Sequence, residues 1–89
     1  MIGKNVYIRG RFSTLGRVTD IAVMYITVED AYWVADTGVR HGKWMREGIA
    51  PTSELEYSGK ARIPVSDISD ILDWPHPLPM VDQPYQSEP

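Results

Sequence analysis

A period-two alternation of side chains across residues 16–31, GRVTDIAVMYITVEDA, constrains this chain more than any other feature. The apolar residues of its second half share one face: Met24, Ile26 and Val28. Such alternation is typical of half-buried β-strands, because successive side chains of a strand point to opposite faces of a sheet. We therefore predict two strands, at residues 16–21 and 24–28, joined by a tight turn.

The predicted turn at residues 21–24 has the apolar sequence Ile-Ala-Val-Met. Exposed turns usually carry Gly, Asn or Asp, because these residues tolerate the backbone angles that a turn requires. An exposed apolar turn is also unusual on the surface of a monomer. The sequence therefore predicts that a neighbouring molecule covers this turn.

Further strands are predicted on both sides of this pair. Residues 5–12 form a first strand, and the strand that starts at residue 24 is expected to end at residues 29–31. Residues 54–57 and 60–65 form a later hairpin with the dipeptide Ser-Gly at its tip. A single helical turn at residues 66–68 and a short strand at residues 69–72 complete the pattern.

A short helix is predicted from about Gly38 to Glu47, within an insert at about residues 37–48. Gly48 is expected to close this helix, because glycine readily adopts the left-handed conformation common at helix ends. One face of the helix carries large side chains at three- and four-residue spacing: His41, Trp44 and Met45. We expect this face to lie over one mouth of a small barrel.

The chain is predicted to be mainly β, with a five-stranded small barrel at residues 1–73 and an extended tail at residues 74–89. The tail begins Trp-Pro-His-Pro-Leu-Pro, and this proline spacing favours the polyproline II conformation. A disordered end is one interpretation. The alternative is docking on the barrel or on a neighbouring subunit, because the tail carries large apolar residues that are unfavourable in water. These residues are Trp74, Leu78, Met80, Val81 and Tyr85.

The bulk composition is that of one small globular domain of 89 residues, with 43% apolar and 24% charged residues. The chain has no cysteine, so neither disulfides nor thiolate chemistry is available. No apolar run approaches the roughly 18 residues of a membrane-spanning helix. The first residues lack the apolar core of a signal peptide. We therefore expect the protein in the cytoplasm or inside a larger assembly.

The net charge of −3 conceals an asymmetry. The first 17 residues contain four bases and no acid, whereas residues 1–72 contain nine of each and are neutral. A protein that binds nucleic acid without sequence preference is usually clearly basic. The basic residues are either solvated faces of an edge strand and a helix, or contacts to an anion or nucleic acid. The candidate contacts are Arg9, Arg11, Arg17, Arg40 and Lys43.

No catalytic or metal motif stands out. The two histidines, His41 and His76, are far apart in sequence and show no metal-ligand spacing. No serine lies in a nucleophile elbow, and no glycine-rich phosphate loop is present. We therefore predict a protein that is not an enzyme, with no cofactor, no metal and no catalytic residue.

The segment GRVTDIAVMYITVEDA, followed later by ARIPVSDISDI, resembles the two sequence segments of the Sm/Hfq-like fold, a small SH3-like β-barrel. A similar layout occurs in uncharacterised small bacterial and phage proteins, with a strand that ends in Glu-Asp-Ala and an aromatic–Ala segment after it. The resemblance covers roughly residues 4–74. It implies a barrel, a ring of subunits and a bacterial or phage origin, including a place in a phage particle.

The same resemblance does not carry over an RNA site. Sm and Hfq proteins have Asn or Gln near the turn before their third strand, where this chain has residues 23–25, Val-Met-Tyr. Their late segment carries Arg-Gly or Lys-His, where this chain has residues 64–66, Pro-Val-Ser.

Three functional interpretations follow. The first is an assembly module that associates with itself or with a larger protein particle through strand edges, an aromatic patch and the tail. Its predicted contacts are large apolar residues: Val23, Met24, Tyr25, Tyr32, Trp33, Trp44, Trp74, Leu78 and Tyr85. The second is an Sm-like nucleic-acid binder. The third is a ring that sequesters a small anionic ligand, such as a nucleotide, beside Arg40 and Lys43.

Overall fold

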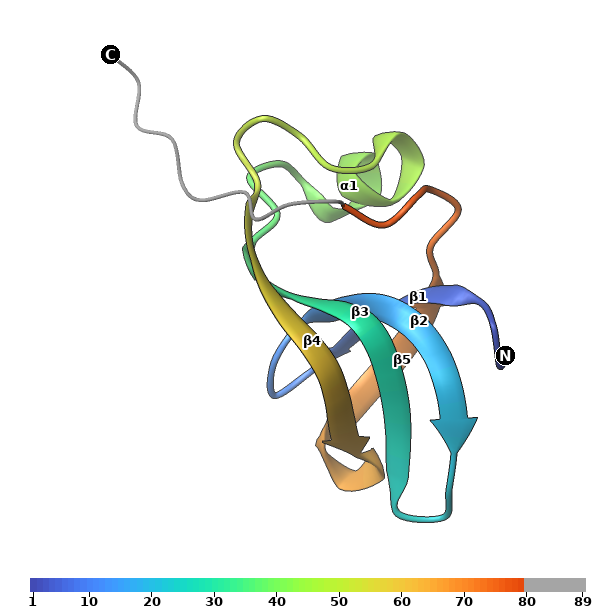
Figure 1. Cartoon of the computed structure of the whole chain (residues 1–89). Helices are drawn as coiled ribbons and strands as arrows, with labels where there is room; N and C mark the ends of the chain where they lie inside the picture. The colour runs from blue at the N-terminus through green and yellow to red at the C-terminus, as the bar shows by residue number, and fades with distance from the viewer. Residues whose placement is uncertain (80–89) are drawn as a thin grey trace.

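The computed structural model describes residues 1–79 as one five-stranded antiparallel sheet with a short α-helix at one end (Figure 1). The elements are β1 (Asn5–Gly10), β2 (Thr14–Ile21), β3 (Tyr25–Asp36), α1 (His41–Glu47), β4 (Glu54–Pro64), the 3₁₀ turn η1 (Val65–Asp67) and β5 (Ile68–Asp73). The strand order is β4-β3-β2-β1-β5. The predicted mainly β architecture with five strands and one short helix is therefore confirmed.

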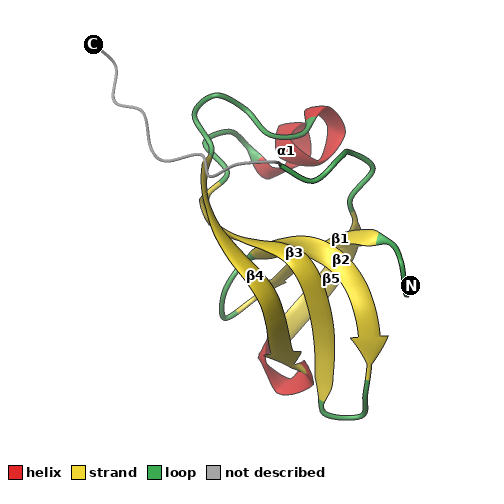
Figure 2. Cartoon of the chain, in the orientation of Figure 1, coloured by secondary structure: helices red, strands yellow, loops and turns green. Residues whose placement is uncertain are grey.

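The sheet curves strongly but is not closed into a barrel (Figure 2). β4 and β5 are its two edges, because β4 pairs only with β3 and β5 pairs only with β1. The turn η1 joins these edge strands directly. Pro64 is the last residue of the edge strand β4, a position where a strand tolerates proline.

Two clusters of buried side chains cover the two faces of the sheet. The sheet cluster lies inside the curved sheet and contains Val6, Ile8, Val18, Ile26, Val28 and Ala31. The helix cluster lies beneath α1 and contains Tyr7, Leu15, Tyr32, Val34, Trp44, Leu55 and Trp74. Strand β1 contributes to both, since Tyr7 points to the opposite face from its neighbours in sequence.

The predicted alternation of β2 and β3 is confirmed at the centre of the sheet cluster. Val18 pairs with Val28, and both side chains are fully buried. Gly16 packs closely against Val28: a Cβ atom added at position 16 would lie 3.0 Å from the Val28 Cβ atom. A larger residue at position 16 would therefore displace the core of the sheet.

The prediction that the third strand ends at residues 29–31 is wrong. β3 continues to Asp36, because Tyr32 and Val34 are buried and pair with β4. Asp30 adopts a positive φ of 51°, and the register shifts between Val28 and Ala31. The Glu-Asp-Ala sequence therefore marks an irregularity inside one long strand.

The predicted hairpin at residues 54–65 is also wrong, because β4 is one strand over its whole length. Both of its halves pair with β3: Leu55 lies opposite Val34, and Ile63 lies opposite Ile26. Gly59 has a positive φ of 74° and lies opposite Ala31 at the register shift of β3. The residues expected at a hairpin tip therefore form a bulge that matches the irregularity of the partner strand.

The helix α1 begins at His41, three residues after its predicted start, and ends at Glu47 with Gly48 as its C-cap, as predicted. Gly38 lies in the preceding loop with a positive φ of 73°, which is not helical. Ser53 ties the loops on the two sides of α1 together: its Oγ atom donates to the Thr37 carbonyl at 2.6 Å and accepts from the Ala50 N–H at 3.0 Å. The turn η1 and strand β5 each start one residue earlier than predicted.

Candidate functional site

The β2–β3 turn and η1 together expose a group of apolar side chains, which we call the apolar tip: Val23, Met24, Tyr25 and Val65. Figure 1 shows this turn at the end of the sheet opposite α1. Val23 is 93% exposed and Met24 67% exposed. The backbone N–H of Val65 donates to the Met24 carbonyl at 2.9 Å, so the two segments are held side by side. The tip therefore presents a fixed apolar surface to solvent.

The apolar tip is also hollowed. Its residues, together with Pro64 and Ser66, line a depression of about 310 Å³. The predicted contacts Val23, Met24 and Tyr25 are thus brought together at one exposed place. Val65 is a member that the sequence did not suggest, because it follows Tyr25 by 40 positions.

A second hollow, which we call the seam groove, lies where the sheet fails to close. It has a volume of about 560 Å³ and runs along β4 beside the β1–β2 loop and η1. The residues that line it include Phe12, Trp33, Glu56, Arg62, Ile63 and Asp67. Phe12 is 62% exposed and Trp33 is 41% exposed. Two large aromatic rings therefore stand at the rim of an open groove.

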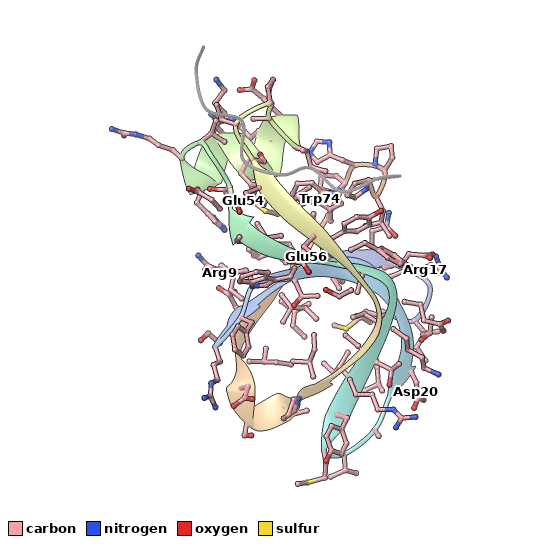
Figure 3. The ribbon with its side chains drawn as sticks, turned by 60° about the vertical axis from the view of Figure 1, so that its left-hand side comes forward. Arg9, Arg17, Asp20, Glu54, Glu56 and Trp74 are labelled. Carbon is pink, nitrogen blue, oxygen red and sulfur yellow. The ribbon has the colours of Figure 1, made fainter. Side chains whose placement is uncertain are left out.

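Three aromatic residues predicted as partner contacts, Tyr32, Trp44 and Trp74, lie instead in the core of the chain itself. Each is at most 4% exposed. Their side chains meet because α1, β3 and the segment after β5 converge on one face of the sheet. Figure 3 shows Trp74 at the α1 end of the molecule.

Leu78 packs against the helix cluster as a partly buried residue. His76 lies nearby and its Nε2 atom is 2.9 Å from the Met45 carbonyl. The first part of the predicted tail, residues 74–79, therefore docks on its own domain. The predicted contact Tyr85 lies outside the described residues.

Two of the five candidate anion contacts are paired with carboxylates. The Arg9 guanidinium donates to Asp70 across the β1–β5 pair, with Nε 2.8 Å from Oδ1, and Arg17 donates to Asp30. Hydrogen bonding from Arg9 lowers the pKa of Asp70 below its usual value. Figure 3 shows Arg9 and Arg17 on opposite sides of the molecule, so they do not form one basic patch.

The other three candidate contacts are exposed. Arg11 lies over the Phe12 ring, with its Cζ atom 5.9 Å from the ring centroid. Arg40 and Lys43 lie at the start of α1. They are separate from the apolar tip, since α1 is at the other end of the sheet (Figure 1).

The two histidines both lie at the α1 end, each against a different aromatic ring. His41 is stacked near Tyr7, with ring centroids 5.4 Å apart, whereas His76 lies against Trp74 at 4.9 Å. Residues 1–79 contain no group of three or more His, Cys, Asp or Glu side chains arranged for a metal ion. The His41 Nε2 and Trp44 Nε1 atoms are buried without a hydrogen-bond partner in this part of the chain.

Comparisons with protein-family models, with curated proteins and with solved structures found no match to this chain. Within the described residues, no helix is long and apolar enough to cross a membrane.

Sequence reasoning missed the seam groove. Phe12 and Arg62 are 50 positions apart in the printed sequence and become neighbours only because the sheet curves. The available signal was Pro64, because a proline within a strand indicates a sheet edge, and a free edge leaves adjacent side chains uncovered.

Proposed function

We propose that the protein is a non-enzymatic assembly module that binds a second copy of itself, or a larger protein particle, through its apolar tip and free strand edges. The observation that carries this proposal is the exposure of Val23 and Met24 on a fixed, hollowed surface. Exposed apolar patches rimmed by polar residues mark interaction sites in small proteins. Burial of this patch would contribute about 25 cal/mol for each Å² removed from water.

The two sheet edges support the same function. β4 has 11 residues and β5 has six, and neither has a second strand partner within residues 1–79. Unpaired strand edges are templates for pairing with another chain. The Lys60 side chain and the bulge at Gly59 discourage unrestricted pairing along β4, so we propose that the tip selects the partner and an edge extends the contact.

We also propose that the sheet is an SH3-like or Sm-like small barrel that has an open seam, from a bacterium or phage. The strand order and the 3₁₀ turn between the last two strands support this assignment. A cytoplasmic complex or a phage particle would then be the setting in which the tip is covered.

A nucleic-acid binder and a ring that sequesters a nucleotide are the alternative proposals, and they have less support. Arg9 and Arg17 already pair with carboxylates, and Arg40 and Lys43 line neither the seam groove nor the hollow of the apolar tip. A raised ratio of 260 to 280 nm absorbance in the purified protein would favour either alternative.

The test is native mass spectrometry and light scattering on the full chain and on a double variant, Val23→Asp with Met24→Asp. We expect the wild-type chain to form a discrete oligomer and the variant to be monomeric. The matched control is Ile2→Asp, the same change at a residue that is 64% exposed and outside the tip. A variant that retains the wild-type mass would contradict the role of the tip.

A further inference from the structure

We propose that two copies of this chain pair through their β4 edges, antiparallel and centred near Ser58, to form a closed two-fold dimer. This inference rests on the proposed assembly function and deepens it, because it names the edge, the partner and the orientation. The partner is a second copy of the chain, and the contact joins the two sheets into one.

The strand β4 has a free edge. It pairs only with β3, and Figure 2 shows it at the rim of the sheet. Within residues 1–79, the backbone of residues 58–63 makes no hydrogen bond to another segment beyond the ladder with β3. Glu56 and Arg62 line the seam groove beside this strand, so the space against their side chains is open. An unpaired edge of this kind accepts a strand from a second chain.

The charges of β4 form two halves of opposite sign. The first half contains Glu54 and Glu56, and the second half contains Lys60 and Arg62. Glu56 and Lys60 each lie two positions from Ser58. Glu54 and Arg62 each lie four positions from it. None of these charged side chains forms an ion pair within the described residues, so the strand is complementary in charge to a reversed copy of itself.

This pattern selects the orientation of the pair. In an antiparallel pair centred at Ser58, the acidic half of each copy lies beside the basic half of the other, across a strand spacing of about 4.8 Å. A parallel pair would place acids beside acids and bases beside bases, which is unfavourable. A one-residue change of register at the bulge of Gly59 leaves the opposite halves side by side. Because a two-fold axis relates the two identical edges, the assembly closes at two copies.

The other edge strand lacks this complementarity. β5 contains Asp70 and Asp73 and no base, and Asp70 is already paired with Arg9. Two β5 edges would therefore bring only acids together. Lys60 discourages pairing of β4 with an apolar edge, whereas the acidic half of a second β4 accommodates it. The same charges thus disfavour an unrelated strand and favour a second copy of the chain.

The experiment reverses the charge of one half of the edge at a time in the full chain. One variant carries Glu54→Lys with Glu56→Lys, and the other carries Lys60→Glu with Arg62→Glu. Each variant alone has two halves of the same sign, so we expect its dimer Kd to rise by about tenfold or more. An equimolar mixture should form a one-to-one heterodimer in native mass spectrometry, because each half again meets its opposite. Single variants that dimerise like wild type, or a mixture without heterodimer, would overturn the proposal.

Two controls separate pairing from net charge. The variant with all four reversals keeps the wild-type net charge and should regain the wild-type dimer. Lys43→Glu with Arg46→Glu changes the net charge as the basic-half variant does, at exposed residues of α1, and should leave the dimer intact. Loss of the dimer in this α1 variant would contradict a specific role of β4. Circular dichroism of each variant confirms that the sheet is folded.

A disulfide trap tests the geometry of the pair. The chain has no cysteine, so a single introduced cysteine can form a disulfide only between copies. Directly opposite residues of antiparallel strands have Cα atoms about 4.5–5.5 Å apart, a separation that a disulfide bridges. We expect Ser58→Cys to give a cross-linked dimer under mild oxidation and Ser69→Cys, at an exposed position of β5, to give none. Equal cross-linking at the two positions, or none at Ser58, would contradict the pairing.

The apolar tip and the β4 edge are tested separately. If the β4 variants dissociate and the Val23 and Met24 variant keeps the wild-type mass, the role of the tip is wrong and the β4 pairing stands. The reverse result contradicts the β4 pairing and leaves the tip in place. A wild-type chain that stays monomeric at its highest soluble concentration contradicts the β4 pairing and leaves a larger particle as the partner of the tip.

Discussion

The indole rings of Trp44 and Trp74 lie with their centroids 4.8 Å apart and join α1 to the segment that follows β5. Trp44 is fully buried and Trp74 is 4% exposed. The Trp74 backbone N–H donates to the Asn5 carbonyl at 3.0 Å, which continues the β1–β5 pairing. The segment after β5 therefore helps to form the core that holds α1 on the sheet.

Replacing Trp74 should destabilise the fold itself. We expect Trp74→Ala to lower the free energy of unfolding by about 3–5 kcal/mol, because it removes a large buried side chain and leaves a cavity under α1. Urea denaturation followed by circular dichroism measures this change. The control is Trp33→Ala, at a residue that is 41% exposed, for which we expect about 1 kcal/mol or less. Similar losses in the two variants would contradict the assignment of Trp74 to the core.

Two glycine-to-alanine substitutions should change the stability of the protein in opposite directions. A Cβ atom at Gly10 would lie 1.9 Å from the Asp67 carbonyl oxygen, so Gly10→Ala must displace η1 and should destabilise by about 1–3 kcal/mol. Gly42 is exposed within α1, and a Cβ atom there meets only the flexible end of Arg46. We expect Gly42→Ala to stabilise by about 0.5–1 kcal/mol. Thermal unfolding of the two variants beside wild type checks both signs.

The Arg9–Asp70 pair should make stability depend on pH in the acid range. Arg9 lowers the pKa of Asp70 in the folded protein, chiefly through its hydrogen bond. The contribution is therefore present above the unfolded pKa of about 3.9 and is lost as pH falls through the lower folded value. Asp70→Asn should flatten the pH dependence of the unfolding free energy below about pH 4.

The contribution of the Arg9–Asp70 pair to the free energy of unfolding should be modest and sensitive to salt, because both side chains are partly exposed. Asp20→Asn is the control, since Asp20 is exposed and forms no ion pair in the described part of the chain. Urea titrations at several pH values provide the measurement. An identical pH slope for the two variants would rule out the contribution of the pair.

The loops around α1 should depend on one hydroxyl group. Ser53 is fully buried and bonds both Thr37 and Ala50. Ser53→Ala should lower the free energy of unfolding by about 1–3 kcal/mol, because it leaves partly buried backbone groups without that partner. Ser58→Ala, at an exposed serine on β4, should have little effect. Faster hydrogen exchange around α1 in the Ser53 variant alone would identify where stability is lost.

Part of the candidate site could be predicted from the sequence. The apolar turn at residues 21–24 signalled the tip, because turn chemistry is a local property. The predicted aromatic contacts were less successful: Tyr32 and Trp33 are neighbours in sequence, yet one is buried and the other is 41% exposed. Only the side of the sheet on which α1 packs distinguishes them.

The sequence by itself determined the central strands and the end of the helix. The alternation of β2 and β3 and the glycine after α1 both reflect local backbone geometry. The tertiary structure decided where strands continue. β3 and β4 each run through residues that read as a strand end or a hairpin tip, because the two irregularities pair with each other across the sheet. The tertiary structure also decided which charged side chains form ion pairs. Arg9 pairs with a carboxylate 61 residues away, and only the pairing of β5 with β1 brings the two together.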